Sequence, residues 1–490
     1  MIKRFLMCLP WVIVACMSCD APQKSPINKP NIVFILADDL GWADLPIYGN
    51  TFNEAPNITK LADEGMRFDN AYAASPVCSP TRASIQSGQY PATVGITDFI
   101  TGHWRPYEEV IVPTNSTQYL PLENIIFAER LKEAGYATGY VGKWHLGGGE
   151  FNPTRQGYDE QAVYNGGSYF EFGNRMSPPQ QFADSVVLSE ALTDLGLDFI
   201  EKNKKKPFLL FLSHYDVHVQ LDAQQELIDK YMNKPKADGY PSNAVYAAMV
   251  ENIDRSVGRV TARLKELGLE DNTILVFFSD NGGLVSRFDK VPLIADSKQY
   301  LYEGDTLLYV ASSNGPLRGE KGTLYEGGIR EPFLVKWPGV VAAGALNHSL
   351  VSSVDFYPTF LDLAGLSNDG RQQLDGNSLM PVLTRQVENY DRTIFWHYPV
   401  YHHHVPASAL RKGDFKLIEN LVDGSLELYN LREDVGEKQD LSDSLTEKTE
   451  ELYEILKNWQ KETGAKIPVP NPDFDAKRRH EWGIHPDRQQ

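Results

Sequence analysis

The chain has 490 residues, of which 42% are hydrophobic and 23% are charged, and its formal net charge is −18. This composition is typical of a soluble globular protein, and the length predicts one large domain accompanied by a smaller one. The negative charge argues against nucleic acid and anionic membrane surfaces as partners. Any site for an anion must therefore be a local cationic pocket.

The start of the chain predicts export. A basic beginning is followed by a short apolar run over residues 5–15, which is the pattern of a secretory signal. The run Ile-Val-Ala-Cys that ends at Cys16 resembles a bacterial lipobox, and Cys19 is a competing acylation site. We expect a lipoprotein-type signal peptide over 1–19 and a polar tether over 20–29. These place the protein in the bacterial periplasm or on the outer membrane through a lipid anchor; a plain cleaved signal peptide is the alternative.

Short apolar runs, each followed at once by polar residues, predict buried strands of a largely parallel sheet. The runs cover residues 32–37, 136–141, 208–212 and 274–278. In open α/β sheets, ligands bind beyond the carboxyl ends of such strands, so the polar residues that follow are candidate site residues. Amphipathic patterns predict helices over 246–267 and 355–365.

The pattern of apolar and polar residues changes after about residue 390. Apolar runs flank Asp423-Gly424, which predicts a β-hairpin, and a helical pattern ending at Gly464 follows. We expect a large catalytic domain over 30–388 and a smaller domain over 389–490, built from an antiparallel sheet and a helix.

Cys78 is the only cysteine beyond the leader, and it opens the run Cys-Ser-Pro-Thr-Arg that ends at Arg82. A lone thiol in an exported chain has no disulfide partner, so its alternative role is that of a small buried apolar side chain. Pro80 suits the first turn of a helix, and Gly88 is a stop signal. The helix dipole and the arginine would both favour negative charge at position 78.

An all-oxygen set of side chains follows two of the predicted strands, namely Asp38, Asp39, Asp280 and Asn281. Hard oxygen ligands select calcium or magnesium rather than zinc. Each pair taken alone could be a solvated turn. Because both pairs follow buried strands, the sequence predicts a metal site.

Together these motifs resemble those of the type I, formylglycine-dependent sulfatases, an arylsulfatase-like family of the alkaline-phosphatase-like superfamily. The matching segments occur in family order, at 38–41, 78–82 with the Gly-Gln-Tyr-Pro turn at 88–91, 142–147, 279–283 and 317–330. The resemblance implies an α/β fold in which helices sandwich a large, mostly parallel sheet, with a smaller C-terminal α+β subdomain.

The resemblance also implies a post-translational modification. In this family the cysteine, here Cys78, is oxidised to formylglycine (3-oxoalanine), whose hydrated aldehyde supplies the nucleophilic oxygen. The partner would be a formylglycine-generating or an anaerobic sulfatase-maturating enzyme. A calcium ion that also contacts residue 78 would be held by Asp38, Asp39, Asp280 and Asn281.

The remaining catalytic roles are carried over from the family in the same way. Arg82 would hold the modified residue, and Lys143 and Lys321 would bind sulfate oxygens. His145 would interact with the hydrate and help the sulfated intermediate collapse, while His218 would protonate the leaving alcohol. These roles agree with the chemistry, because attack on a charged ester needs cations and a poor leaving group needs a proton.

Two departures from the family pattern bear on these roles. The residues after His218 are Val219-Gln220, where the family often has a proline, and His214 is therefore an alternative acid. We expect His218 to be the acid because of its register from the preceding strand. Gln89 replaces an arginine that is common in the family's turn.

Substrate-binding residues are predicted from loops near the motifs. We expect His103 and Arg105 from the loop after the nucleophile helix, and His397 from the start of the smaller domain, where three further histidines occupy 402–404. A surface loop without such a role is the alternative for the triple histidine, and a zinc site there lacks spaced partners.

The prediction for function is an exported, calcium-dependent sulfatase that hydrolyses sulfate esters of carbohydrates, such as a sulfated glycan or oligosaccharide. The lipoprotein leader and the family's range, rather than any residue, indicate the sugar. Alternatives are a phosphodiesterase or phosphonate hydrolase on the same scaffold, or a catalytically silent glycan-binding lipoprotein.

Overall fold

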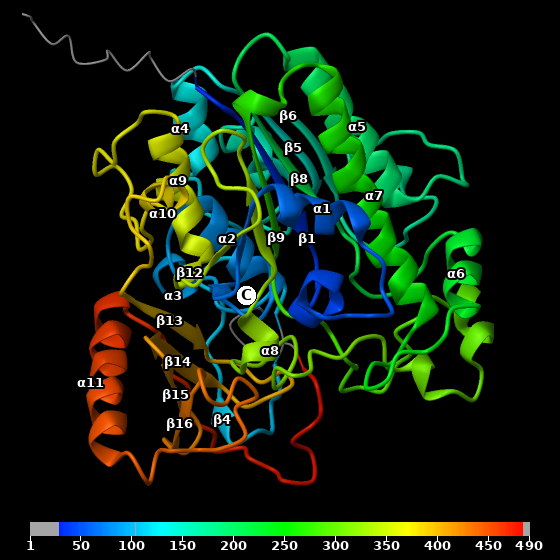
Figure 1. Cartoon of the computed structure of the whole chain (residues 1–490). Helices are drawn as coiled ribbons and strands as arrows, with labels where there is room; N and C mark the ends of the chain where they lie inside the picture. The colour runs from blue at the N-terminus through cyan, green and yellow to red at the C-terminus, as the bar shows by residue number, and fades with distance from the viewer. Residues whose placement is uncertain (1–28, 103, 484–490) are drawn as a thin grey trace, which may run out of the picture.

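A computed structural model describes residues 29–102 and 104–483, and its centre is a nine-stranded sheet (Figure 1). The five central strands run parallel, and antiparallel strands adjoin them on both sides. In spatial order the strands are β11 (Ala345–Asn347), β2 (Met66–Phe68), β10 (Phe333–Lys336), β9 (Thr273–Ser279), β1 (Asn31–Ala37), β8 (Phe208–Ser213), β5 (Ala137–Lys143), β6 (Glu160–Tyr164) and β7 (Met176–Ser177). The predicted mostly parallel α/β sheet is confirmed.

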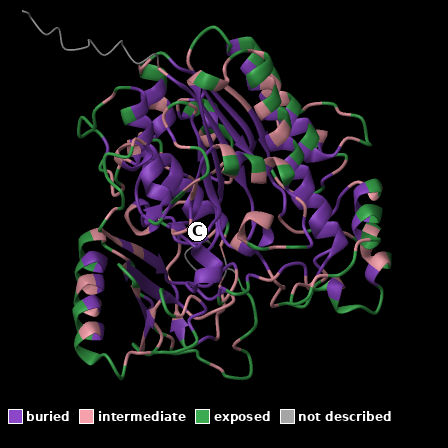
Figure 2. Ribbon diagram, viewed as in Figure 1, coloured by how far each residue is buried: buried purple, intermediate pink, exposed green. Residues whose placement is uncertain are grey.

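Helices cover both faces of this sheet, because its strands alternate their apolar side chains between two cores. Val33 and Ile35 of β1 face one core, and Phe34 and Leu36 face the other. The first core is closed by α1 (Pro56–Glu64), α5 (Leu188–Asn203), α6 (Gln225–Met232) and α7 (Ala244–Glu266). The second is closed by α2 (Cys78–Ser87), α4 (Phe127–Glu133), α9 (Phe356–Leu363) and α10 (Met380–Leu383). Figure 2 shows the strands buried between the two layers.

The smaller domain is an antiparallel sheet with one long helix. Its strands are β13 (Thr393–Tyr398), β14 (Ala407–Lys412), β15 (Phe415–Asn420) and β16 (Leu426–Asn430). Helix α11 (Thr446–Thr463) covers one face through Leu452, Leu456 and Trp459, and the other face packs against the large domain. The predicted hairpin and helix are both confirmed, and Gly464 ends the helix in the left-handed conformation at φ 65°.

Short elements connect the two domains. Strand β12 (Val351–Ser352) pairs with β3 (Ala71–Tyr72), and β17 (Val469–Pro470) pairs with β4 (Val110–Ile111). Helix α8 (Glu326–Ile329) lies against the smaller sheet, and α3 (Pro91–Val94) follows α2, the helix that begins at Cys78. The end of the described chain thus returns to the large domain beside β4.

The leader and tether predictions cover residues 1–29, of which 1–28 lie outside the described residues and only position 29, the last of the tether, lies within them. His103 lies outside them as well. Over residues 29–102 and 104–483, no helix combines the length and apolarity needed to cross a bilayer.

Candidate active site

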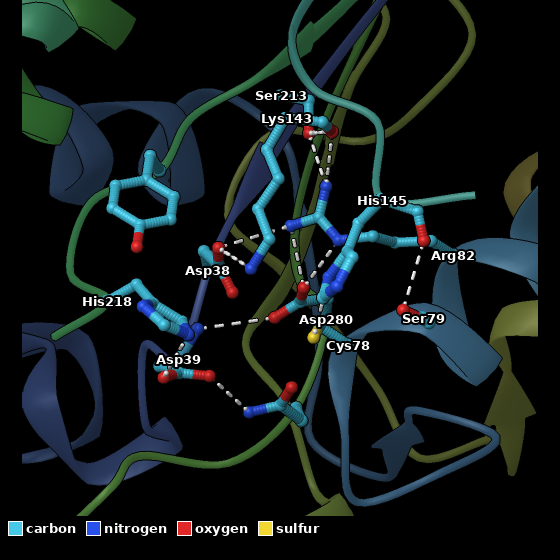
Figure 3. A network of polar contacts seen from close by, with 12 residues as sticks. Asp38, Asp39, Cys78, Ser79, Arg82, Lys143, His145, Ser213, His218 and Asp280 are labelled. Atoms are coloured by element: carbon cyan, nitrogen blue, oxygen red, sulfur yellow. Dashed lines mark hydrogen bonds and ion pairs between the residues drawn. The ribbon is translucent and has the colours of Figure 1, made fainter. Parts of the chain in front are cut away.

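Polar side chains from four strands meet at one edge of the sheet. Asp38 and Asp39 follow β1, Lys143 ends β5, Ser213 ends β8, and Asp280 follows β9. They converge because parallel strands place their carboxyl ends at the same edge. Figure 3 shows these side chains pointing toward one another around Cys78.

Cys78 is the first residue of α2 and is only 2% exposed. Its Sγ lies 3.2 Å from Nδ1 of His145. The helix continues to Ser87 and ends where Gly88 adopts a left-handed φ of 71°, as the sequence predicts. The thiol therefore sits at the positive end of a buried helix, in contact with an imidazole.

Arg82 lies one helical turn after Cys78 and contacts residues at the ends of three strands. Its Nε and Nη2 lie 2.8 and 2.6 Å from Oδ2 of Asp280. Its Nη1 donates to the Lys143 carbonyl and to the Ser213 hydroxyl, both at 2.6 Å. Burial would lower the pKa of Arg82, but Asp280 and the other carboxylates raise it above its ordinary value. Arg82 is therefore a permanent charge that positions three segments of the site.

Two lysines hold the first acidic pair. Lys143 Nζ lies 2.5 Å from Oδ2 of Asp38, and Lys321 Nζ contacts both oxygens of Asp39 at 2.7 and 2.8 Å. Burial would raise the pKa of each aspartate, but the adjacent lysines and the other cations outweigh burial and lower it. With Arg82 and Asp280, the site contains three cationic side chains and three carboxyl groups in direct contact, and burial together with the neighbouring Asp38 raises the pKa of Asp280 although Arg82 opposes the shift.

Hydrogen bonds to backbone carbonyls determine which ring nitrogen of each site histidine faces the site. His145 Nε2 lies 2.5 Å from the Ile100 carbonyl, so Nε2 carries the proton and Nδ1 is the acceptor that faces residue 78. His218 Nδ1 lies 2.6 Å from the Val219 carbonyl, which leaves Nε2 facing the site, 3.8 Å from Asp39. Burial, reinforced by Lys143, lowers the pKa of His145 to about 3 and that of His218 to about 4.

His214, the alternative acid, lies in the core. It is fully buried, and its Nε2 contacts the Ser256 hydroxyl of α7 at 2.8 Å. His218, by contrast, lines the cavity beside Lys143. The geometry therefore favours His218 over His214.

A cavity of about 300 Å³ opens beside Lys143 and the two site histidines. Gly147, which closes the 142–147 motif, also lines it, together with Tyr164, Asn165, Gly166 and Tyr215, which no motif in the sequence indicated. The contact of Ser213 with Arg82 was not predicted from the sequence either. Tyr164 ends β6, and Ser213 and Tyr215 lie at the end of β8, so applying the strand-end rule to every strand would have found these three. Asn165 and Gly166 belong to a loop with no motif of its own.

The oxygen set fits a hard cation. Asp38 Oδ1 and Asn281 Oδ1 are buried, and neither has a hydrogen-bond partner within the described part of the chain. The Asn281 amide nitrogen donates to Asp39 at 2.8 Å, which fixes its oxygen as the free atom. Ligand atoms of Asp38, Asp39 and His218 lie within 4.8 Å of one another, whereas the oxygens of Asp280 contact Arg82 and the Asp39 N–H. The unpaired oxygens favour calcium or magnesium over zinc.

Close backbone packing explains two glycines of the motifs. A Cβ on Gly282, directly after Asn281, would lie 1.9 Å from the Gly327 carbonyl oxygen. Gly142, directly before Lys143, has a φ of 108°, and a Cβ there would lie 1.8 Å from the Ser213 carbonyl oxygen. Any side chain at either position would push a catalytic loop out of place.

The structure bears differently on each predicted substrate-binding residue. The prediction for His397 is contradicted, because this residue of β13 is 2% exposed and both ring nitrogens are satisfied inside the protein. One contacts the Ser408 hydroxyl at 2.6 Å, and the other the Lys466 carbonyl at 3.0 Å. Ser408 lies opposite His397 in the pairing of β13 with β14, and the histidine cluster in the sequence does not reveal this long-range register.

Arg105 is largely engaged within the protein. It contacts Glu108 and the His402 carbonyl, both at 3.2 Å, and its guanidinium lies 4.6 Å from the Trp482 ring centre. His403 of the triple histidine contacts the Lys321 carbonyl at 2.9 Å. His403 thus supports the loop that carries Lys321, and the role of these residues toward a substrate stays a prediction.

Comparisons with known proteins agree with this site. A family model described as "Sulfatase" matches residues 30–366, and one described as "N-sulphoglucosamine sulphohydrolase, C-terminal" matches residues 319–463. A sulfatase of Formosa agariphila is 32% identical, covering 86% of this chain and 85% of that protein. Human N-acetylgalactosamine-6-sulfatase is 34% identical, covering 77% of this chain and 69% of its own length.

A solved structure shares the architecture. The crystal structure of Ps i-CgsB superposes with a TM-score of 0.72 and is 30% identical, covering 91% of this chain and 95% of that one. The first family model alone spans more than half of the chain and includes every predicted catalytic and metal-binding residue. The protein therefore belongs to the sulfatase family of the alkaline-phosphatase-like fold and is a sulfuric ester hydrolase.

Proposed function

We propose that the protein hydrolyses sulfate esters of carbohydrates, with formylglycine made from Cys78 as the nucleophile and calcium as the bound metal. The observation that carries this proposal is the position of Cys78, at the N-terminus of a buried helix, 3.2 Å from an imidazole acceptor. Support for a sugar comes from relatives: one is named N-acetylgalactosamine-6-sulfatase, and the structure of Ps i-CgsB was also solved in complex with k-i-k-neocarrahexaose.

A bound divalent ion would adapt the site to an anionic substrate. The three buried cations of the site each contact a carboxyl group, so the protein groups alone offer little unpaired positive charge to a sulfate ester. A divalent ion held by Asp38, Asp39, Asp280 and Asn281 would make the site net positive and would supply charge against the developing anion. Formylglycine at position 78 would supply, as a hydrated aldehyde, a nucleophilic oxygen in place of the thiol.

Each of the other site residues has its own role in the proposed reaction. Nδ1 of His145 accepts a proton from residue 78, because Nε2 is already committed to the Ile100 carbonyl. Lys143 and Lys321 bind the ester oxygens, and Arg82 keeps α2 and Asp280 in position.

His218 is placed to protonate the leaving alcohol through Nε2. In the free site its pKa is about 4, because of burial and Lys143, so the imidazole is neutral at pH 7. An anionic ester bound beside it would stabilise the imidazolium and raise this pKa toward the working range.

Modification of Cys78 would precede folding. The side chain is 2% exposed, beneath the loops that carry Lys321 and His145, so a formylglycine-generating or anaerobic sulfatase-maturating enzyme could not reach it in the folded protein. Export to the periplasm or outer membrane with a lipid anchor stays a prediction from the leader.

The test pairs peptide mass spectrometry with activity. The chain is produced with and without a maturating enzyme, and residue 78 is identified by its mass. Sulfate release is then measured on sulfated sugars and an aryl sulfate, with phosphate and phosphonate esters in parallel. We expect activity only where residue 78 is the aldehyde, and a strong preference for sulfate esters. Full activity with an unaltered thiol, or faster turnover of phosphate or phosphonate esters, would contradict the proposal. Binding of sulfated sugars without turnover by matured protein would point to the catalytically silent alternative.

A further inference from the structure

Two loops of the active site are joined by hydrogen bonds. The Asp280 loop (residues 280–286) follows β9, and the Lys321 loop (residues 317–323) precedes α8. The Glu320 carboxylate of the second loop accepts from two backbone N–H groups of the first, those of Val285 at 2.7 Å and Ser286 at 3.1 Å. The path of the Lys321 loop therefore depends on its contacts with the Asp280 loop.

His403 contacts both of these loops from the smaller domain. It lies between β13 and β14 in the chain. Its Nδ1 lies 2.9 Å from the Lys321 carbonyl, and its Nε2 lies 2.9 Å from the Ser286 carbonyl. Nδ1 also lies 2.7 Å from Nδ1 of His402. The ring of His403 therefore bridges the two loops, although it belongs to another domain.

The two carbonyl contacts determine how many protons the ring of His403 carries. A carbonyl oxygen only accepts, and a neutral imidazole has one N–H, so a neutral ring would direct a lone pair at one of the carbonyls. A neutral ring protonated at Nε2 could accept from His402, but its Nδ1 would then face the Lys321 carbonyl without a proton. The imidazolium donates to both carbonyls, and His402 Nδ1 can accept from the same Nδ1 proton. Because charged donors make the stronger hydrogen bonds, the geometry fits the doubly protonated ring.

The charged groups near this imidazole are paired with one another. The Lys321 ammonium is directed away from its own carbonyl, to both oxygens of Asp39 at 2.7 and 2.8 Å. Arg105, which donates to the carbonyl of the preceding histidine, contacts Glu108 at 3.2 Å. The Glu320 carboxylate brings a negative charge to the segment of backbone that the imidazole contacts. A positive charge on the imidazole therefore has an anion on the same segment.

We propose that His403 is a positioning residue for Lys321, and that it acts as an imidazolium which holds the Lys321 loop against the Asp280 loop. The inference rests on the proposed function, in which the Lys321 ammonium binds sulfate oxygens. The backbone of the loop fixes where that ammonium lies, and a displacement of about 1 Å can cost about 100-fold in rate. The smaller domain thus completes the catalytic site through a histidine whose ring nitrogens face backbone carbonyls.

The test compares two variants with the wild type on a sulfated monosaccharide and an aryl sulfate. His403→Phe keeps a planar ring and removes both donors, so kcat/KM should fall by about 10–100-fold. The loss should be the same on both esters, because each presents the same sulfate group to Lys321. His403→Gln keeps one donor group and should lose less. His348→Gln is the matched control, because this exposed histidine contacts Asp69 after β2, and we expect it to change neither rate.

The pattern of losses separates positioning from other roles of His403. A loss on the sugar ester alone would mean that the residue contacts the sugar. A lower Tm with unchanged kcat/KM on both esters would mean that it only stabilises the fold. Either result refutes the proposal.

Two measurements on protein with an unaltered Cys78 are independent of turnover. In wild type labelled with ¹⁵N-histidine, NMR at pH 7 should show both ring nitrogens of His403 protonated, and the signal is assigned by its loss in His403→Gln. Calorimetry with calcium present should show an affinity for inorganic sulfate that is about tenfold weaker in His403→Phe.

These measurements keep the two proposals apart. A neutral His403 ring, or an unchanged affinity for sulfate in His403→Phe, refutes the positioning role and leaves the proposed function standing. If matured wild type releases no sulfate from either ester, but the ring is doubly protonated and the variant binds sulfate more weakly, the proposed function fails while the positioning role stands.

Discussion

Lys416 of β15 offers a quantitative test of how the two domains hold together. Its ammonium is fully buried and contacts Glu326 of α8 at 2.9 Å and Glu437 at 2.8 Å. Glu326 also accepts from the Tyr72 hydroxyl at 2.8 Å, and its backbone N–H donates to Glu437 at 2.7 Å. Because α8 follows the loop that carries Lys321, this cluster joins the smaller sheet to a catalytic segment.

We expect Lys416→Met to lower the free energy of unfolding by about 3–5 kcal/mol at pH 9, because it leaves two carboxylates buried without their cation. The loss should shrink at pH 6. Burial already raises the pKa of Glu437 to about 7, even though Lys416 opposes the shift. Without the lysine this pKa rises further, so at pH 6 the carboxyl takes up a proton and the charge repulsion disappears.

The assay is urea unfolding followed by tryptophan fluorescence at both pH values. The double variant Lys416→Met with Glu437→Gln should recover most of the loss, since Glu326 keeps Tyr72 and Arg330 as partners. Lys448→Met is the control, because Lys448 makes an exposed ion pair and should leave unfolding unchanged. A loss below about 1 kcal/mol at pH 9, or the same loss at both pH values, would refute the reasoning.

Three further predictions concern the site and the core. His218→Gln should slow the release of sulfate from a sugar by about 10²–10⁴-fold but affect an aryl sulfate much less. His214→Gln should lower stability and leave both rates unchanged. Equal losses on both esters for His218→Gln would exclude His218 as the acid. Chelation of the metal, verified by elemental analysis, should abolish turnover, and calcium should restore it; full activity without metal would contradict the calcium proposal. Burial lowers the pKa of His397 to about 4, below its unfolded value of about 6.5. Because the unfolded chain then takes up a proton that the folded protein does not, the free energy of unfolding should fall as pH drops from about 6.5 to 4, by up to about 3 kcal/mol. His397→Gln should remove this part of the acid sensitivity, and a Tm profile against pH that matches the wild type would show that another group is responsible.

Local patterns in the sequence were enough for the fold and the centre of the site. The apolar runs predicted four central strands, and polar residues that follow each of them lie at one sheet edge, because parallel strands end together. The helix that begins at Cys78 followed from Pro80 and Gly88, which act on the backbone within one turn. The smaller sheet followed from Asp423-Gly424, whose turn preference is also local.

Contacts between segments far apart in the sequence decided the rest. Which histidine faces the cavity depends on how the segment after β8 packs against α7, and this placed His214 in the core and His218 in the pocket. The burial of His397 depends on the register of β13 with β14, which places Ser408 opposite it. Local propensity carries no information about such pairings, because the residues that pair are chosen by packing of the whole chain rather than by their neighbours in sequence.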